Sequence, residues 1–277
     1  MLIDSHCHIQ DKEFDRDRAA VLERARENGV QAFVAIGTDM VSSEKAIALA
    51  AAEDDVYATV GVHPHEAKTL DRDTLQGLRE LASAPKVVAI GETGLDFYRN
   101  LSSPEQQRRA FRQQLELAAE LRLPVVIHSR EAEEETYQIL AEHREELASS
   151  RDQGRPLGVM HCFAGDISLA LRYTQMGFLI SIPGICTYPK AEILCAVASG
   201  LPLRCLVVET DSPYLAPQSK RGRRNEPSYL RETVEHIARL RHEAYEAVAS
   251  GSSLSAARLF GLGESEGEDR AREGGVG

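Results

Sequence analysis

The chain has 277 residues, of which 43% are hydrophobic and 5% aromatic, and its formal net charge is −11. This length suits one large α/β domain or two small ones, and the sequence has no run of roughly 18 apolar residues, so we expect no membrane-spanning helix. A strongly acidic chain repels polyanions, which argues against nucleic-acid binding by bulk charge and requires any phosphate group to be held locally.

The cysteine pattern predicts a reducing compartment. Five cysteines are an odd number, and none of them forms a CxxC pair, so a disulfide framework is not expected. The first residues show no basic region followed by a hydrophobic stretch, which predicts no secretory signal and a cytoplasmic location. Cys7 and Cys162 each precede or follow a candidate ligand histidine, and we expect both to be buried packing residues instead of ligands.

Eight short apolar segments alternate with amphipathic stretches along the chain. The predicted strands are residues 2–5, 32–36, 57–61, 87–90, 125–127, 158–160, 178–181 and 206–208. They are mostly continuous Val- and Ile-rich runs, which is typical of parallel strands buried on both faces. Eight such strands predict a closed (β/α)8 barrel of the TIM type better than an open doubly wound sheet. No GxGxxG or GxxxxGK[ST] loop supports a nucleotide-binding sheet.

Helix signals lie between the strands. Ser103 is a candidate N-cap, followed by Pro104 at the first helical position and Gln106 at the capping-box position. The predicted helices are residues 15–28, 105–122, 130–149, 227–248 and 253–260. Residues 263–277 are rich in Gly and Glu with few apolar residues, so we expect a single barrel domain over residues 1–262 and a disordered acidic tail.

Residues able to bind metals follow the predicted strands, where barrel enzymes place their chemistry. His6 and His8 end the first strand, and because side chains alternate along a strand, they point to the same side. Later strands are followed by His63 and His65, Glu92, His128, His161, and finally Glu209 and Asp211. Imidazoles and carboxylates gathered at one end of a barrel predict a site for transition-metal ions.

Seven motifs in a fixed order make this prediction more specific. They are residues 4–8 (DSHCH), 61–65 (GVHPH), 91–96 (GETGLD), 126–130 (VIHSR), 161–163 (HCF), 209–215 (ETDSPYL) and 221–227, which begins RG and ends NEP. With these motifs the chain resembles the TatD family of metal-dependent hydrolases, within the wider amidohydrolase-like group of barrels, from about residue 2 to about residue 260. The resemblance implies a (β/α)8 barrel, a two-metal site and DNase activity, often as an exonuclease on single-stranded ends.

The resemblance also implies the metal ligands. His6, His8, Glu92 and Asp211 would hold one divalent ion, while Glu92, His128 and His161 would hold the second. A bridging carboxylate suits such a pair. Four imidazoles with two carboxylates favour Zn, Mn, Fe, Co or Ni, whereas Mg prefers more oxygen ligands. The metal, whether Zn, Mn, Mg or a similar ion, is not decided by the sequence.

Three carboxylates are the predicted catalytic residues. By the resemblance, Glu92 would bridge the two ions, and Asp211 would orient the water that attacks the phosphodiester and take its proton. Glu209 precedes Asp211 by two residues and faces the same side if the strand continues. It would orient a ligand histidine or assist proton transfer, and a purely structural role is an equal alternative.

The predicted substrate contacts are polar or aromatic residues near strand ends: His63, Tyr98, Arg130, Arg221, Arg224 and Asn225. Arginines after the eighth strand suit phosphate, because barrels often bind phosphate there. The alternative for this loop is a solvated basic segment. Tyr98 would stack on a base or pack at the barrel mouth. We expect His65 to be a turn residue.

Two enzymatic functions and one non-enzymatic function fit these residues. The first is a metal-dependent DNase, with DNA as its substrate and single-stranded ends as the expected site of cleavage. The second is a metal-dependent deacylase or esterase, for example on aminoacylated tRNA, because the same activated water would serve. The third is a metal-binding scaffold without catalysis, against which both Glu92 and Asp211 are present. The sequence does not decide the oligomeric state and is compatible with a monomer.

Overall fold

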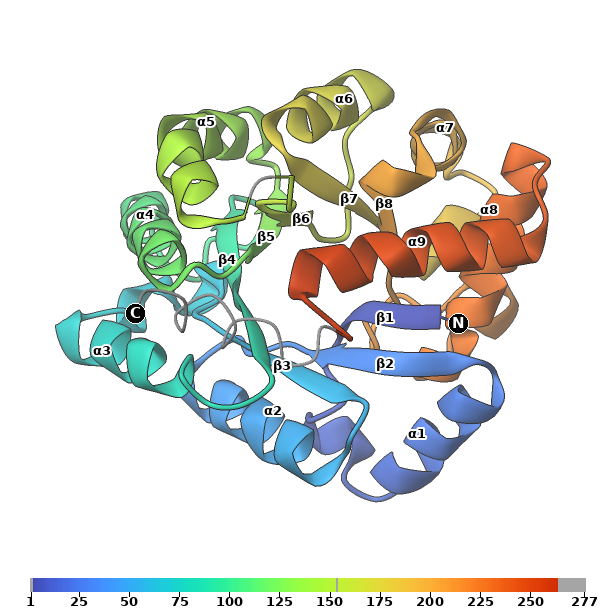
Figure 1. The fold of residues 1–277 in the computed structure, drawn as a ribbon, viewed down its shortest axis with the longest axis horizontal. Helices are drawn as coiled ribbons and strands as arrows, with labels where there is room; N and C mark the ends of the chain where they lie inside the picture. The colour runs from blue at the N-terminus through green and yellow to red at the C-terminus, as the bar shows by residue number, and fades with distance from the viewer. Residues whose placement is uncertain (1, 153, 264–277) are drawn as a thin grey trace, which may run out of the picture.

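The computed structural model describes residues 2–152 and 154–263. Over these residues, eight parallel strands follow one another in chain order in one sheet, with helices around the outside (Figure 1). The strands are β1 (Leu2–Cys7), β2 (Val30–Ala35), β3 (Val56–Val60), β4 (Val87–Asp96), β5 (Val125–Arg130), β6 (Gly158–Met160), β7 (Phe178–Ile182) and β8 (Leu206–Val208). The α-helices are α1 (Arg18–Glu27), α2 (Met40–Ala52), α3 (Arg72–Leu81), α4 (Pro104–Leu121), α5 (Glu133–Ser150), α6 (Ile167–Met176), α7 (Glu192–Gly200), α8 (Leu230–Arg241) and α9 (Tyr245–Phe260). The fold is the predicted (β/α)8 barrel.

The barrel closes where the chain after β8 meets β1. The Asp211 N–H donates to the His6 carbonyl at 2.9 Å, and the His8 N–H donates to the Ser212 carbonyl at 2.7 Å. The Ser5 hydroxyl adds a bond of 2.9 Å to the carbonyl of Val208. These bonds place the first residues of the chain beside residues 208–212, which are more than 200 positions away in sequence.

Aliphatic side chains fill the end of the barrel where the strands begin. One buried cluster takes residues from the strands and from α9: Ile3, Val34, Val126, Val159, Leu179, Val207, Leu259 and Phe260. Figure 1 shows α9 lying next to β1. A larger cluster lies between the strands and the outer helices. Because bulky branched residues pack the barrel interior, the fold needs no Trp in its core.

The two C-terminal helices differ from the prediction, which placed helices at residues 227–248 and 253–260. In the structure α8 ends at Arg241, because His242 adopts a left-handed conformation with φ 55° and its N–H caps the helix on the Ala238 and Arg239 carbonyls. Helix α9 then runs unbroken through Gly251. A Cβ at Gly251 would lie 3.0 Å from the Leu203 side chain, so this glycine permits close packing and does not end a helix.

The other predicted elements agree with the structure to within a few residues, apart from β4. Helix α4 starts as expected, with the Ser103 hydroxyl accepting from the Gln106 N–H and the Gln106 side chain accepting from the Ser103 N–H. Apart from Gly263, the predicted tail lies outside the described residues. None of the helices in the described ranges is both long and apolar enough to cross a membrane.

Strand β4 extends to Asp96, six residues past its predicted end, and this extension carries Glu92 into the barrel. Its pairing with β5 shifts register between Ile90 and Thr93, so a bulge surrounds Glu92. Gly94 has φ 137°, and a Cβ there would overlap the His128 carbonyl oxygen of β5. Only glycine therefore lets β4 approach β5 so closely, which explains why the sequence places a glycine two residues after Glu92.

Candidate metal centre

The predicted metal ligands gather at the barrel end where the strands finish. A cavity of about 370 Å³ opens there, lined by His8, Asp11, Thr38, Asp39, His63, His65, Glu66, Glu92, His128, His161, Asp211 and Tyr214. His6 is 1% exposed and contacts the same group from β1. The structure thus brings all six predicted ligands together, although they come from five different strand ends.

The first set of ligand atoms lies between β1, β4 and the turn after β8. His6 Nε2 and His8 Nε2 are 3.3 Å apart, and Asp211 Oδ1 lies 3.6 Å and 3.3 Å from them, respectively. Ligands about 2.1 Å from a tetrahedral ion are roughly 3.4 Å from one another. The spacing of these three atoms is therefore that of ligands around one ion.

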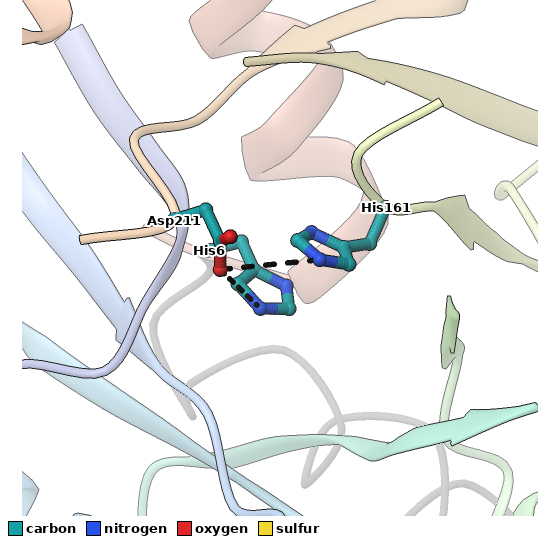
Figure 2. A group of neighbouring side chains, drawn as sticks. All are labelled: His6, His161 and Asp211. Carbon is teal, nitrogen blue, oxygen red and sulfur yellow. Dashed lines mark ion pairs between the residues drawn. The ribbon is translucent and has the colours of Figure 1, made fainter. Parts of the chain in front are cut away.

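Glu92 and His161 also border this set. Glu92 Oε2 lies 3.5 Å from His6 Nε2. The His161 ring is stacked on the His6 ring with centroids 3.4 Å apart, and its Nε2 lies 4.0 Å from Asp211 Oδ1. Figure 2 shows the Asp211 carboxylate facing both rings, although the three residues come from different strand ends.

The second set surrounds the other oxygen of Glu92. Its Oε1 lies 2.9 Å from His128 Nδ1, 3.5 Å from His63 Nε2 and 3.7 Å from His161 Nε2. The sequence assigned His63 to the substrate; in the structure it lines the cavity and also lies among candidate ligand atoms. Burial lowers the pKa of His63 to about 4, so its imidazole is neutral near pH 7 and retains the lone pair that a ligand needs.

Glu92 joins the two sets because its two oxygens face different imidazoles. The carboxylate is 3% exposed, and burial opposes its ionisation, but His63, His161 and the other imidazoles outweigh burial and hold its pKa well below the ordinary value. An ionised carboxylate with one oxygen in each set is the arrangement that bridges two cations. The donor set therefore fits the pair of divalent ions that the family resemblance implies.

Asp96 contacts the ring nitrogen of His128 that does not face Glu92. Its Oδ2 lies 3.2 Å from His128 Nε2 and 2.8 Å from His65 Nε2, and its Oδ1 accepts from the Arg99 N–H at 2.7 Å. With Nε2 of His128 facing Asp96, Nδ1 is left to face Glu92. Sequence reasoning gave Asp96 no role, although it follows Glu92 by an even number of residues on one strand and so shares its side.

Glu209 holds His161 in the same way. Its Oε2 lies 3.0 Å from His161 Nδ1 and accepts from the Ser181 hydroxyl at 2.6 Å, while its Oε1 accepts from the Cys162 N–H at 2.8 Å. Burial lowers the pKa of His161, but Glu209 and Glu92 outweigh it and raise that pKa to about 10. Of the roles considered for Glu209, these contacts favour orientation of a ligand histidine.

The turn that carries Asp211 is fixed from two sides. The buried Asp4 carboxylate accepts from the Thr210 N–H at 2.9 Å and from its hydroxyl at 2.6 Å. Asn225 is also fully buried, and its amide donates to the carbonyls of Thr210 at 2.8 Å and Tyr214 at 2.6 Å. Because Asn225 uses its amide hydrogens within the protein, it supports the turn, and this differs from the substrate contact predicted for it.

Comparison with known proteins agrees with this geometry. The family model described as TatD related DNase matches residues 3–261. The chain belongs to this family. It is 37% identical to "Uncharacterized metal-dependent hydrolase YabD" of Bacillus subtilis, over 94% of this chain and 99% of that protein. It is 39% identical to "3'-5' ssDNA/RNA exonuclease TatD" of Erwinia tasmaniensis, over 94% of this chain and 100% of that protein.

Solved structures show the same relationship. The crystal structure of YJJV, a TatD homolog from Escherichia coli, superposes with a TM-score of 0.87 at 30% identity, covering 94% of this chain and 98% of that one. A hydrolase of the TatD family from Entamoeba histolytica gives a TM-score of 0.82 at 23% identity, covering 94% and 97%. The second likeness concerns the fold alone.

The arginines predicted to bind substrate lie outside the cavity lining of this TatD family chain. Arg130 is exposed and lies over the ring of half-exposed Tyr98, with 3.9 Å from its Cζ to the ring centroid. Arg221 lies over the Tyr188 ring at 5.1 Å. Arg224 is paired with Asp17, with Nη2 2.7 Å from a carboxylate oxygen. Of these arginines, Arg130 and Arg221 are free of a carboxylate partner among the described residues.

The cavity lining itself is acidic. Asp11, Asp39 and Glu66 line it along with the ligands, and none of the described lining residues is Lys or Arg. A phosphate group entering this cavity would meet carboxylates and imidazoles, with Thr38 and Tyr214 as the other lining residues. Bound cations would supply the missing positive charge, which is a second reason why the donor set fits metal ions.

Proposed function

We propose that this TatD family protein is a two-metal nuclease that cleaves phosphodiester bonds of single-stranded DNA or RNA from a free end. The observation that carries the proposal is Glu92, whose two oxygens face separate groups of ligand atoms. Relatives named as 3'-5' ssDNA/RNA exonucleases support the substrate class. These names favour the phosphodiester over the ester or amide alternative, and the complete ligand set argues against an inactive scaffold.

The first set would consist of His6, His8, Glu92 and Asp211, and the second of Glu92, His128 and His161, with His63 as a further candidate. Two divalent ions held there would lower the pKa of a water molecule and neutralise charge developing on a phosphoryl group. Asp96 and Glu209 keep the ligand nitrogens of His128 and His161 directed at the cavity.

Asp211 is the proposed proton acceptor. Burial raises its pKa, but His8, His161 and His6 outweigh burial, so the carboxylate is ionised at neutral pH. It lines the cavity as a member of the first set, and its Oδ1 lies 4.0 Å from Nε2 of His161 in the second set. On the rim, Arg130 with Tyr98 and Arg221 remain the proposed contacts to the rest of the strand, because they lie outside the acidic lining.

The test uses linear and circular single-stranded DNA of the same sequence, labelled at one end or internally. With Mn²⁺, Mg²⁺ or Zn²⁺ supplied to metal-depleted protein, we expect shortening of the linear strand from one end and an intact circle. Glu92→Gln is the control for contaminating nuclease. Failure to cleave DNA or RNA with any of these metals, while ester substrates are hydrolysed, would overturn the proposal. The predicted cytoplasmic location is not tested by this experiment and remains a prediction.

A further inference from the structure

The turn after β8 places an aromatic ring beside the metal centre. Tyr214 follows Asp211 by three residues, lines the same cavity and is 54% exposed. Its ring meets the ring of the ligand His8 at an interplanar angle of 69°, with centroids 5.9 Å apart. An aromatic ring half exposed within a polar cavity is poorly hydrated, and a planar ligand group could cover it.

The backbone holds this ring in a defined place. The Tyr214 N–H donates to the Asp211 carbonyl at 2.8 Å, and its carbonyl accepts from the buried amide of Asn225 at 2.6 Å. Asp211 and Leu215, on either side, both have φ 54°. The backbone of Tyr214 is therefore fixed by the same turn that carries Asp211, the proposed proton acceptor.

Tyr98 is also half-exposed, but its surroundings differ from those of Tyr214. Tyr98 does not line the cavity, and the Arg130 guanidinium covers its ring at 3.9 Å. Charge also favours an uncharged group beside Tyr214, because the carboxylate of Asp11 acts on the Tyr214 hydroxyl and both Asp11 and Asp39 line the same cavity. An uncharged, flat nucleobase is not repelled by these carboxylates.

We propose that Tyr214 forms a nucleobase subsite, on which the base next to the cleaved phosphodiester stacks. This inference rests on the proposed nuclease function. Within that function, Tyr214 would be the residue that makes the enzyme prefer unpaired bases. Stacking needs the π-face of a base and no particular hydrogen-bonding edge, so the subsite accepts all four bases. A base within a duplex already has both faces covered and cannot use it.

The experiment combines protein variants with abasic substrates. On single-stranded oligonucleotides, Tyr214→Leu is expected to lower kcat/KM about 5- to 100-fold, mainly through KM, whereas Tyr214→Phe and Tyr214→Trp keep a stacking ring and stay within about threefold of the parent. A second series carries one abasic nucleotide at the first, second or third position from the cleaved end. At one of these positions, the parent and Tyr214→Leu should become equal.

Tyr245→Leu at the start of α9, outside the cavity lining, is the matched control and should leave kcat/KM unchanged. Metal content and the thermal unfolding midpoint show that each variant is folded. The inference is overturned if Tyr214→Leu matches the parent on intact strands, if Tyr214→Phe is as defective as Tyr214→Leu, or if the defect persists at every abasic position. Loss of the proposed function itself would look different, because the parent would then cleave none of the oligonucleotides.

Discussion

The two ends of the barrel are built on the same eight strands but hold opposite kinds of side chain. Where the strands begin, Ile3, Val126 and Val207 pack against Leu259 of α9 in a buried apolar cluster. Where the strands finish, buried histidines and carboxylates face one another, among them Glu92 at 3% and Glu209 at 0% exposure. Apolar burial stabilises the first end, whereas the second collects charges that are costly to bury unless paired or metal-bound.

This contrast suggests that stability and function reside at different ends. Active-site groups are selected for chemistry and do not have to stabilise the metal-free fold, whereas the aliphatic end does. Substitutions where the strands begin should therefore lower the free energy of unfolding, whereas substitutions where the strands finish should lower metal binding and activity.

The largest effect is expected for Glu92→Gln, which removes the charge shared by both ligand sets. We expect nuclease activity to fall about a thousandfold or more, with binding of both ions weakened. Elemental analysis of the metal-loaded variant measures the ions, and circular dichroism confirms the folded barrel. A variant that kept two ions and activity within tenfold of the parent would contradict the bridging role.

The next effect belongs to the opposite end. Leu259→Ala leaves a cavity under α9, so the free energy of unfolding should fall by about 3 kcal/mol, measured by urea denaturation of the metal-free protein. Leu254 on the same helix is 63% exposed, and Leu254→Ala is the matched control, with a change of about 0.5 kcal/mol or less. Altered metal stoichiometry in folded Leu259→Ala would show that the two ends are coupled.

Smaller effects are expected from the carboxylates behind the ligands. Glu209→Gln and Asp96→Asn retain size and hydrogen bonding but lose the charge that orients His161 and His128. Each should weaken metal affinity about 10- to 100-fold, measured by competition with a chelating dye. Asp17→Asn, which alters ion pairs with Arg224 and Arg24 outside the cavity lining, is the control. If both variants bound metal with the affinity of the parent, these carboxylates would not orient the ligand histidines.

The smallest expected effect is a difference between Arg221→Ala and Arg224→Ala in the salt dependence of DNA binding. Arg221→Ala should reduce the salt dependence of single-stranded DNA binding by about 0.7 in the slope of log K against log salt, as expected for one lost phosphate contact. Arg224→Ala should change the slope less, because Asp17 already neutralises that guanidinium. Fluorescence anisotropy between low and moderate salt measures both slopes, and the reverse order would place Arg224 at the substrate.

Local sequence patterns were sufficient to predict the strands, the helices α1, α4 and α5, and the six candidate ligands that the structure brings together, whereas α2, α3, α6 and α7 were not predicted. Buried parallel strands are recognised in the sequence as continuous apolar runs. Because the C-terminal ends of all such strands lie at the same end of the barrel, His6, Glu92 and Asp211 could be placed together without coordinates. The boundary between α8 and α9 could not, because a histidine in a left-handed conformation ends α8 and Gly251 packs on Leu203 inside α9.

Only the tertiary structure decided which residues hydrogen-bond each ligand histidine and which residue supports the Asp211 turn. Glu209 and His161 are 48 positions apart, and Asp96 contacts His128 across 32 positions. Asn225 likewise turned out to support the Asp211 turn from inside the protein. These pairings depend on bulges, on close glycine contacts and on the closure of β8 against β1. A one-dimensional pattern specifies which residue types reach the barrel end, whereas their mutual distances depend on how all eight strands pack.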